Sequence, residues 1–308
     1  MDEYQLPGSV VDQLYGVENS SKAVEYDYAI GGMGDLEEFN GTIPYGEFSG
    51  QYRTSYTHKE WVKGIKIERK LVDDDQYSVI NKRPAMLALV ARRTREKHGA
   101  SLFNNAFNTS VFTGGDSAAL VSATHYRKAT DGSTTAAMSN IGTSALTLTS
   151  LGAARLAMRE FVDDTSNLLN VQPDTLLIPP ELEETAWGIM NSDKQPGNAN
   201  NDANFYRGKY KIVVWDYLSD SNNWYLIDSK YAKMFCKWFN RIPVEFNKDK
   251  DFDTLNVGSL TGNSEQETDL IAGNTLELEL LIAEAEMIAN SDNVQDWSTS
   301  SQALERVA

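Results

Sequence analysis

The 308-residue sequence has only one cysteine and three histidines, and it contains no long apolar run. The single cysteine, Cys236, cannot form an internal disulfide, which fits a reducing compartment. Its apolar and aromatic neighbours predict a packed thiol. No stretch approaches the roughly 18 consecutive apolar residues that span a membrane, so we expect no membrane contact. A hydrophobic content of 41% with 10% aromatic residues is typical of a folded protein rather than a disordered one.

The scarcity of histidine and cysteine also limits the chemistry available to the chain. His58, His98 and His125 are far apart, and no His-x-x-x-His pair, cysteine cluster or Gly-x-Ser-x-Gly elbow occurs. One alternative is a hydrolase in which His125 acts as the general base for Ser122 or Ser117. A general base must lie within about 3 Å of its nucleophile, however, and a sequence does not reveal that distance. We therefore expect that the protein is not an enzyme and that it has neither catalytic residues nor a cofactor.

Two acidic clusters resemble cation sites. The triplet Asp73-Asp74-Asp75 could hold a hard cation, but such a triplet more often ends a strand or caps a turn. The run Asp249-x-Asp251-x-Asp253 begins like a calcium loop. It then has Thr254 instead of glycine at the sixth position and Leu260 instead of glutamate at the twelfth. The sequence predicts no metal site.

The net charge of −16 is distributed unevenly. Residues 1–40 hold nine acids and one lysine, and residues 251–308 hold twelve acids and one arginine, so the centre is slightly basic. Within this centre, residues 51–70 carry six lysines or arginines against two glutamates. Opposite charges could pair between copies of the chain, because complementary patches steer association. The alternative is a solvated surface without a partner.

The stretch from residue 41 to 107 carries the most information. It begins with a glycine- and tyrosine-rich segment, followed by an alternating basic run at 61–71 that predicts a strand. Asn81 is a good N-cap, and Pro84 falls in the first turn of a long helix predicted over 81–107. A projecting hairpin followed by a long helix is explained if the hairpin is buried against a neighbouring copy. The candidate intersubunit contacts are Trp61, Lys63, Ile65, Lys66, Arg69, Arg92 and Arg93.

The rest of the chain alternates between helical and strand patterns, which predicts an α+β fold around one sheet. A helix is expected from about Ser150 to Val162 and another over 181–190. In the last 55 or so residues the periodicity does not distinguish a helix from a strand. Leu276 to Leu280 alternates like a strand but lies within a run of helix-forming residues. Strands are expected at 173–178, 210–217, 224–227, 234–238 and 244–246.

Several stretches in this order resemble the Mu-like major head subunit family, which consists of major capsid proteins of tailed bacteriophages with the HK97-type capsid fold. The most specific run is Leu169 to Glu183, Leu-Asn-Val-Gln-Pro-Asp-Thr-Leu-Leu-Ile-Pro-Pro-Glu-Leu-Glu. In the stretch ending at His125, Ser117 and Val121 depart from the family's pattern, and the acidic segment 257–308 departs from its usual ending. The other matching stretches are Lys66–Arg69, Asp73–Tyr77, Phe112–His125, Met158–Arg159, Trp224–Asp228 and Arg241–Phe246.

The resemblance implies an N-terminal arm at 1–40 and an extended loop at 41–70. It also implies a peripheral domain at 71–139 and 241–308 with a long spine helix, and an axial α/β domain at 140–240. Such subunits assemble into hexamers and pentamers of an icosahedral shell that encloses double-stranded DNA, with which contact is non-specific. Portal and scaffold proteins are expected partners, a decoration protein is a possible one, and assembly is expected in the host bacterial cytoplasm.

Two other functions are compatible with the sequence. An encapsulin-like compartment would use the same fold to enclose an enzyme cargo, and the neighbouring genes would distinguish it from a phage head. A soluble hydrolase based on His125 is a more remote alternative. Some relatives crosslink a loop lysine to an asparagine, but no motif around Lys59, Lys63 or Lys66 supports that chemistry.

Overall fold

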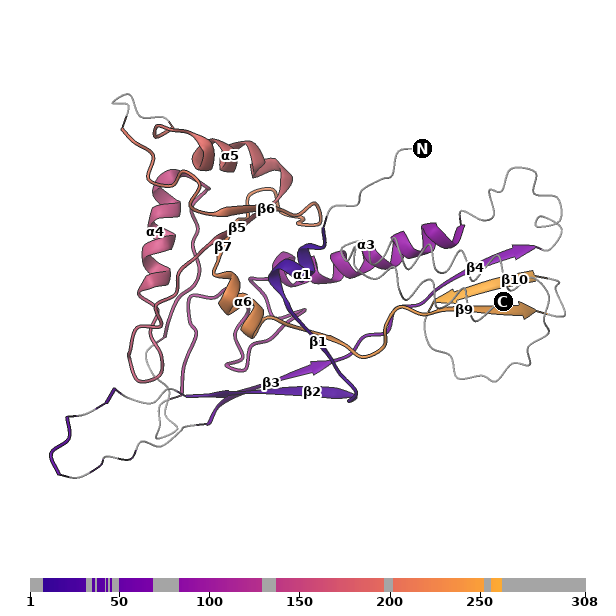
Figure 1. Ribbon diagram of the computed structural model, residues 1–308, viewed down its shortest axis with the longest axis horizontal. Helices are drawn as coiled ribbons and strands as arrows, with labels where there is room; N and C mark the ends of the chain where they lie inside the picture. The colour runs from indigo at the N-terminus through magenta and orange to yellow at the C-terminus, as the bar shows by residue number, and fades with distance from the viewer. Residues whose placement is uncertain are drawn as a thin grey trace, which may run out of the picture. The chain divides into compact units, whose positions relative to one another are not determined.

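The structure is a computed structural model (Figure 1). It describes residues 8–31, 35–36, 38–41, 43, 45, 50–68, 83–128, 137–196, 202–251 and 256–261. The chain divides into two compact units. The sheet unit contains Met1–Gly8, His58–Arg95 and Asn240–Ala308, and the core unit contains Ser9–Thr57 and Glu96–Phe239. Helix α3 (Arg83–Asn104) begins in the first and ends in the second.

The centre of the core unit is a three-stranded sheet in the order β6-β5-β7. Strand β5 (Thr175–Ile178) pairs in parallel with β6 (Lys211–Val214) and antiparallel with β7 (Tyr225–Ile227). All four residues of β5 are buried. A short, continuous apolar run is typical of a strand that is covered on both faces, which agrees with the sequence prediction at 173–178.

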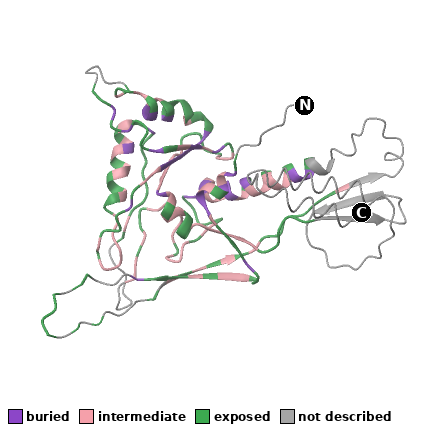
Figure 2. Cartoon of the chain, in the orientation of Figure 1, coloured by how far each residue is buried: buried purple, intermediate pink, exposed green. Residues whose placement is uncertain are grey.

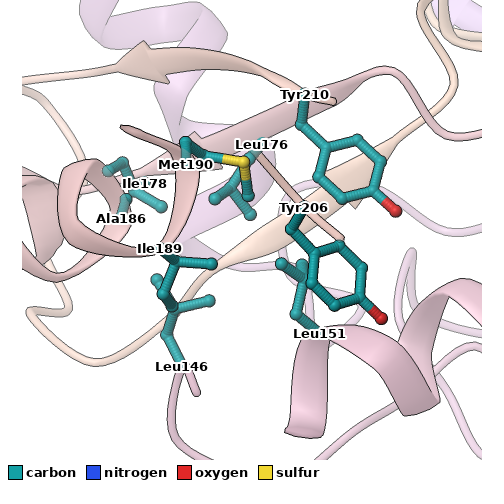
Figure 3. Close-up of a cluster of buried hydrophobic side chains, with 9 residues drawn as sticks. All are labelled: Leu146, Leu151, Leu176, Ile178, Ala186, Ile189, Met190, Tyr206 and Tyr210. Atoms are coloured by element: carbon teal, nitrogen blue, oxygen red, sulfur yellow. The ribbon is translucent and has the colours of Figure 1, made fainter. Parts of the chain in front are cut away.

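One face of this sheet packs against helices α4 (Leu148–Arg159) and α5 (Glu183–Asn191) (Figure 3). Leu176 and Ile178 contribute from β5. Thr147 and Ser150 form a capping box at the start of α4, which satisfies free N–H groups of its first turn. A short 3-10 turn, η2 (Pro180–Leu182), leads into α5. The buried cluster contains Leu146, Leu151, Leu176, Ile178, Ala186, Ile189, Met190, Tyr206 and Tyr210.

A second buried cluster contains Leu177, the β5 side chain that alternates to the other face of the strand. It includes Val11 and Leu14 of helix α1 (Val10–Leu14) and Phe103 of α3. A Cβ atom at Gly99 of α3 would lie 2.6 Å from the Val11 Cγ2 atom. Glycine at this position therefore allows α1 to approach α3 closely, which explains a residue that is otherwise unfavourable in a helix.

Glu96 is a buried carboxylate of α3 that ties this cluster together. The Ser9 hydroxyl donates a hydrogen bond to Glu96 Oε1 at 2.6 Å, and the Trp215 indole Nε1–H donates to Oε2 at 3.1 Å. Both carboxylate oxygens thus have a donor, as a buried charge requires. Burial raises the pKa of the Cys236 thiol to about 11, and the side chain packs against the same cluster. This agrees with the predicted packed thiol.

Two strand pairs complete the core unit. Strands β1 (Gly16–Asn19) and β8 (Lys237–Asn240) form one pair, and β2 (Val24–Ile30) and β3 (Gly50–Thr57) form the other. Helix α6 (Ser229–Phe235) precedes β8. The sheet unit contains an antiparallel sheet in the order β4-β10-β9. Its strands are β4 (Lys63–Glu68), β10 (Asn256–Thr261) and β9 (Phe246–Asp251).

Three predictions need correction and several are confirmed. The described residues form four separate sheets rather than one, because strands distant in sequence pair with one another in small groups. The strand expected at 244–246 begins only at Phe246, as β9. The strand expected at 234–238 is helix α6 followed by β8, because Asp228 caps a helix by accepting hydrogen bonds from the Lys230 and Tyr231 N–H groups. The predicted long helix is α3, and the helices expected near 150–162 and 181–190 are α4 and α5. Asp249 and Asp251 lie on β9, and Asp253 of the same run lies outside the described residues.

Some expectations fall outside the described residues, namely those for the acidic triplet 73–75, for Arg69 and for the tail beyond 261. Part of the predicted arm is described: Val11 and Leu14 of α1 are buried in the core unit, and β2 pairs with β3. Within the described residues, no helix is long and apolar enough to cross a membrane.

Candidate intersubunit surfaces

The β2-β3 ribbon is a partly exposed two-stranded element of the core unit. Tyr26 lies opposite Ser55, and Tyr28 lies opposite Arg53, with an irregularity before Ile30. Figure 2 shows this ribbon as exposed and intermediate residues, whereas β5 is buried. An isolated two-stranded ribbon is marginally stable in water, so its two faces need separate explanations.

The inner face of the ribbon packs within the core unit. The Tyr56 ring lies 5.2 Å from the Phe239 ring in an edge-to-face arrangement, and the Lys237 ammonium lies 3.3 Å from an Asp27 carboxylate oxygen. Burial, followed by the Asp27 charge, raises the pKa of Tyr56 to about 12. A Cβ atom at Gly115 would lie 2.5 Å from the Tyr52 Cβ atom, so the 114–116 turn approaches β3 closely. These contacts attach the ribbon to its own subunit.

The outer face carries large side chains that the subunit leaves in water. Tyr26, Tyr28 and Ile30 are 52%, 62% and 72% exposed. The Arg53 guanidinium lies 4.8 Å from the Tyr26 ring centroid, and its hydrogen bond with Tyr28 raises the pKa of the guanidinium. Large apolar side chains exposed singly are ordinary, but a contiguous group of them marks an interaction site. We name Tyr26, Tyr28 and Ile30 the outer ribbon face.

The predicted contact residues in the loop lie in and just before strand β4. Trp61 is 57% exposed and stands beside the equally exposed Val62. Lys63 is exposed at the start of β4, opposite Thr261, while Ile65 is partly buried opposite Ser259. Lys66 lies opposite Gly258 on the same strand. The structure therefore places Lys63, Ile65 and Lys66 on one strand of the sheet unit, with Trp61 two residues before it.

The remaining predicted contact residues lie elsewhere or outside the described residues. Arg92 is partly buried and Arg93 is exposed, and both are on α3. Arg69 is outside the described residues. Their role in contacts between subunits stays a prediction.

The structure arranges His125 differently from the hydrolase alternative. The His125 Nδ1 atom lies 2.8 Å from the Asp116 Oδ2 atom, which is the acid-histidine half of a catalytic triad. The nucleophile would have to contact Nε2, but this atom is buried without a hydrogen-bond partner among the described atoms. The Ser122 hydroxyl instead accepts from the Thr124 N–H. This geometry gives no support to a serine nucleophile at His125.

Among the described residues, no group of three or more His, Cys, Asp or Glu side chains could hold a metal ion. The Asp116–His125 pair instead stabilises a loop, because Asp116 Oδ1 also accepts from the Ala118 N–H and the His125 backbone bridges to Met138. These hydrogen bonds account for the Asp116–His125 pair as a structural contact within the loop.

The outer ribbon face was missed by sequence reasoning, although a signal existed. Val24, Tyr26, Tyr28 and Ile30 alternate with smaller or charged residues, which is the period of a strand. This run lies in the acidic segment that was interpreted as an extended arm. Its partner strand begins 20 residues after its end, so the pairing itself has no local signal.

The comparison with protein families resolves the identity of this fold. A family described as "Phage capsid protein" matches residues 51–269, which is more than half of the chain. The chain belongs to this family. It is a major capsid protein, a constituent of the phage virion shell, and the match spans strand β4, helix α3 and the whole β6-β5-β7 sheet. No curated protein matches the chain.

Solved capsids show the same fold at low sequence identity. The bacteriophage JBD30 capsid protein is 14% identical, with 71% of this chain and 93% of that chain covered and a TM-score of 0.53. The cyanophage P-SCSP1u capsid protein is 12% identical, with 83% of each chain covered and a TM-score of 0.50. The predicted α+β capsid fold is confirmed, whereas membership of the Mu-like subfamily stays a prediction.

Proposed function

We propose that this capsid protein assembles into hexamers and pentamers of an icosahedral shell around double-stranded DNA, and that it has no catalytic role. In this proposal the outer ribbon face and the Trp61 segment, which is Trp61 with Val62, lie against neighbouring subunits. The arm, extended loop, peripheral and axial regions correspond to residues 1–40, 41–70, 71–139 with 241–308, and 140–240. Assembly takes place in the host bacterial cytoplasm.

The observation that supports this proposal best is the contrast between the two faces of the β2-β3 ribbon. The inner face has aromatic and ionic partners in its own subunit, at Phe239 and Lys237. The outer face exposes half or more of each of three large side chains. Burying about 100 Å² of apolar surface contributes roughly 2.5 kcal/mol, so covering such a face in every subunit would stabilise a shell considerably.

Portal and scaffold proteins are proposed partners on family grounds alone. In one similar solved structure, the JBD30 capsid is decorated with minor capsid protein trimers. We propose that a decoration protein of comparable kind can bind the shell formed by this chain. Co-sedimentation of purified particles with candidate proteins encoded beside the capsid gene would test this, and absence of any stoichiometric partner would contradict it.

The substitution Trp61→Asp tests the loop contact. Because Trp61 is 57% exposed, the unassembled variant should retain the thermal stability of the wild type. A charge buried at an interface without a partner costs several kcal/mol, so the variant should yield few particles by electron microscopy and sedimentation. Trp61→Tyr, which keeps an aromatic ring, is the matched control and should assemble. Normal particle yield from Trp61→Asp would show that this segment makes no contact essential to the shell.

A further inference from the structure

A cluster of positive charge lies on the core unit, where helix α4 meets the 205–209 turn. Arg155 and Arg159 are four residues apart on α4 and thus share one face of the helix. The Lys209 Nζ atom lies 3.5 Å from the Phe205 ring centroid, and the Arg155 Cζ atom lies 5.3 Å from the same centroid. We name Arg155, Arg159, Lys209 and Phe205 the basic patch.

The basic patch is electrostatically uncompensated within the described subunit. Desolvation, followed by the charges of Arg155 and Arg159, lowers the pKa of Lys209. No salt bridge joins any of these three cations to an acidic side chain of the described residues. The Arg155 Nε atom is buried without a hydrogen-bond partner among the described atoms. Three like charges held together in this way favour binding of an anion.

A complementary surface lies at the start of α5 in the same unit. Glu181, Glu183 and Glu184 are all exposed, and Trp187 is 63% exposed one turn further along the helix. Pro180, Glu183, Glu184 and Trp187 line a shallow, open depression. We name Glu181, Glu183, Glu184 and Trp187 the acidic patch. Acids favour a helix N-terminus in any case, but the helix dipole does not account for an indole exposed beside them.

The chemistry of this depression suits a guanidinium or ammonium group. An indole face attracts cations more strongly than the other aromatic rings do, and carboxylates nearby add charge-assisted hydrogen bonds. Arginine also forms bidentate bonds with carboxylates and stacks on aromatic rings. The exposed Arg159 at the end of α4 is therefore the side chain of the basic patch that best fits the depression.

We propose that the basic patch of one copy of this chain binds the acidic patch of the next copy. Two different, complementary patches on one subunit form a heterologous interface, and such an interface generates a closed ring when its rotation closes. The contact would thus help to define the capsomer ring, which rests on the proposed function. It is separate from the outer ribbon face and the Trp61 segment, which lie on other elements.

A second copy fits the basic patch better than nucleic acid does. Each subunit supplies one basic and one acidic patch, so a ring would satisfy all of them in equal number. The chain carries a net charge of −16, which opposes general binding to phosphate backbones. Phosphate binding at this patch is a distinct outcome, which a DNA-binding measurement on the same variants detects.

Single charge reversals with matched controls test the inference. Arg159→Glu and Glu184→Arg should each raise the subunit concentration needed for assembly by roughly tenfold, because they place like charges across the interface. The double variant Arg159→Glu/Glu184→Arg should return the threshold to near the wild-type value. Lys230→Glu and Asp216→Arg make the same charge changes at other exposed positions of the core unit. These two control variants should have the wild-type assembly threshold. Thermal unfolding of each subunit checks that folding is intact.

The outcomes separate this inference from the proposed function. Wild-type protein that never forms shells would contradict the proposed function itself. If the wild type assembles while both single reversals behave like the controls, or if the double variant is not rescued, only the paired-patch inference is wrong. If Arg159→Glu assembles normally but loses affinity for a short DNA duplex, the patch binds phosphate and the inference is overturned.

Discussion

Strand β5 and the β2-β3 ribbon differ in how far their side chains are buried within the same subunit. Every residue of β5 is buried, with Leu176 and Ile178 in one cluster and Leu177 in the other. The ribbon buries its inner face only partly and exposes Tyr26 and Tyr28 on the other face. The first arrangement stabilises the subunit, and the second leaves apolar surface for contacts that only an assembled shell can complete.

This contrast implies that subunit stability and shell stability can be altered separately. Substitutions in β5 should unfold the subunit before they affect any interface. Substitutions on the outer ribbon face should leave the subunit folded, since these side chains are already in water. The expected loss in the free energy of unfolding of the unassembled subunit decreases from Leu177 to Asp228 to Asp174.

Leu177→Ala should have the largest effect. The side chain is fully buried, and truncating a buried leucine to alanine typically costs about 2–5 kcal/mol. Tyr28→Ala, on the exposed face of the ribbon, should change the same quantity by less than about 0.5 kcal/mol. Urea unfolding of both variants measures the difference. Comparable losses in the two variants would contradict the division between a stabilising sheet and an exposed ribbon face.

Asp228→Ala should have an intermediate effect. This buried carboxylate accepts hydrogen bonds from the N–H groups of Lys230, Tyr231 and Gln172. Loss of a helix N-cap and of the buried acceptor for Gln172 should cost about 1–3 kcal/mol. Asp228→Asn keeps one side-chain acceptor and should recover part of this loss in the same unfolding assay. An alanine variant as stable as the wild type would show that Asp228 does not hold α6 in place.

The smallest predicted effect concerns pH. Partial burial alone would raise the pKa of Asp174, but hydrogen bonds from Ser229 and Thr175 outweigh it and lower the pKa below its usual value. A carboxylate with a lowered folded-state pKa contributes stability above its unfolded pKa, and that contribution is lost as pH falls through the folded value. Asp174→Asn should therefore be less stable than the wild type near neutral pH. The difference should shrink below about pH 4. A difference that is constant with pH would rule out this ionic contribution.

The elements with local signals could be predicted from the sequence. The run Thr175–Ile178 before two prolines predicted β5, and Pro84 predicted the start of the long helix now seen as α3. Asp228 was an available capping signal for α6, but the apolar run around Met234 was interpreted as a strand. Strand β10 is polar and contains Gly258, so nothing local indicates that it lies between β4 and β9.

The candidate surfaces could be predicted only in part. Trp61 and Lys63 were identified because a basic, alternating loop without a core suggests a partner. The outer ribbon face depends on pairing between segments distant in sequence, and the basic patch depends on the 205–209 turn approaching α4. Sequence periodicity describes one element at a time and does not contain such contacts between elements. A family resemblance supplied the fold but not these residues.

The central claim is that the outer ribbon face and Trp61 are solvent-exposed in the subunit and covered in the shell. Hydroxyl-radical footprinting read by mass spectrometry measures this directly on the unmodified protein, as free subunits and as purified particles. We predict that labelling of Tyr26, Tyr28 and Trp61 falls severalfold in particles, while the buried Trp215 is weakly labelled in both states. Equal labelling of Tyr26, Tyr28 and Trp61 in subunits and particles would contradict the claim.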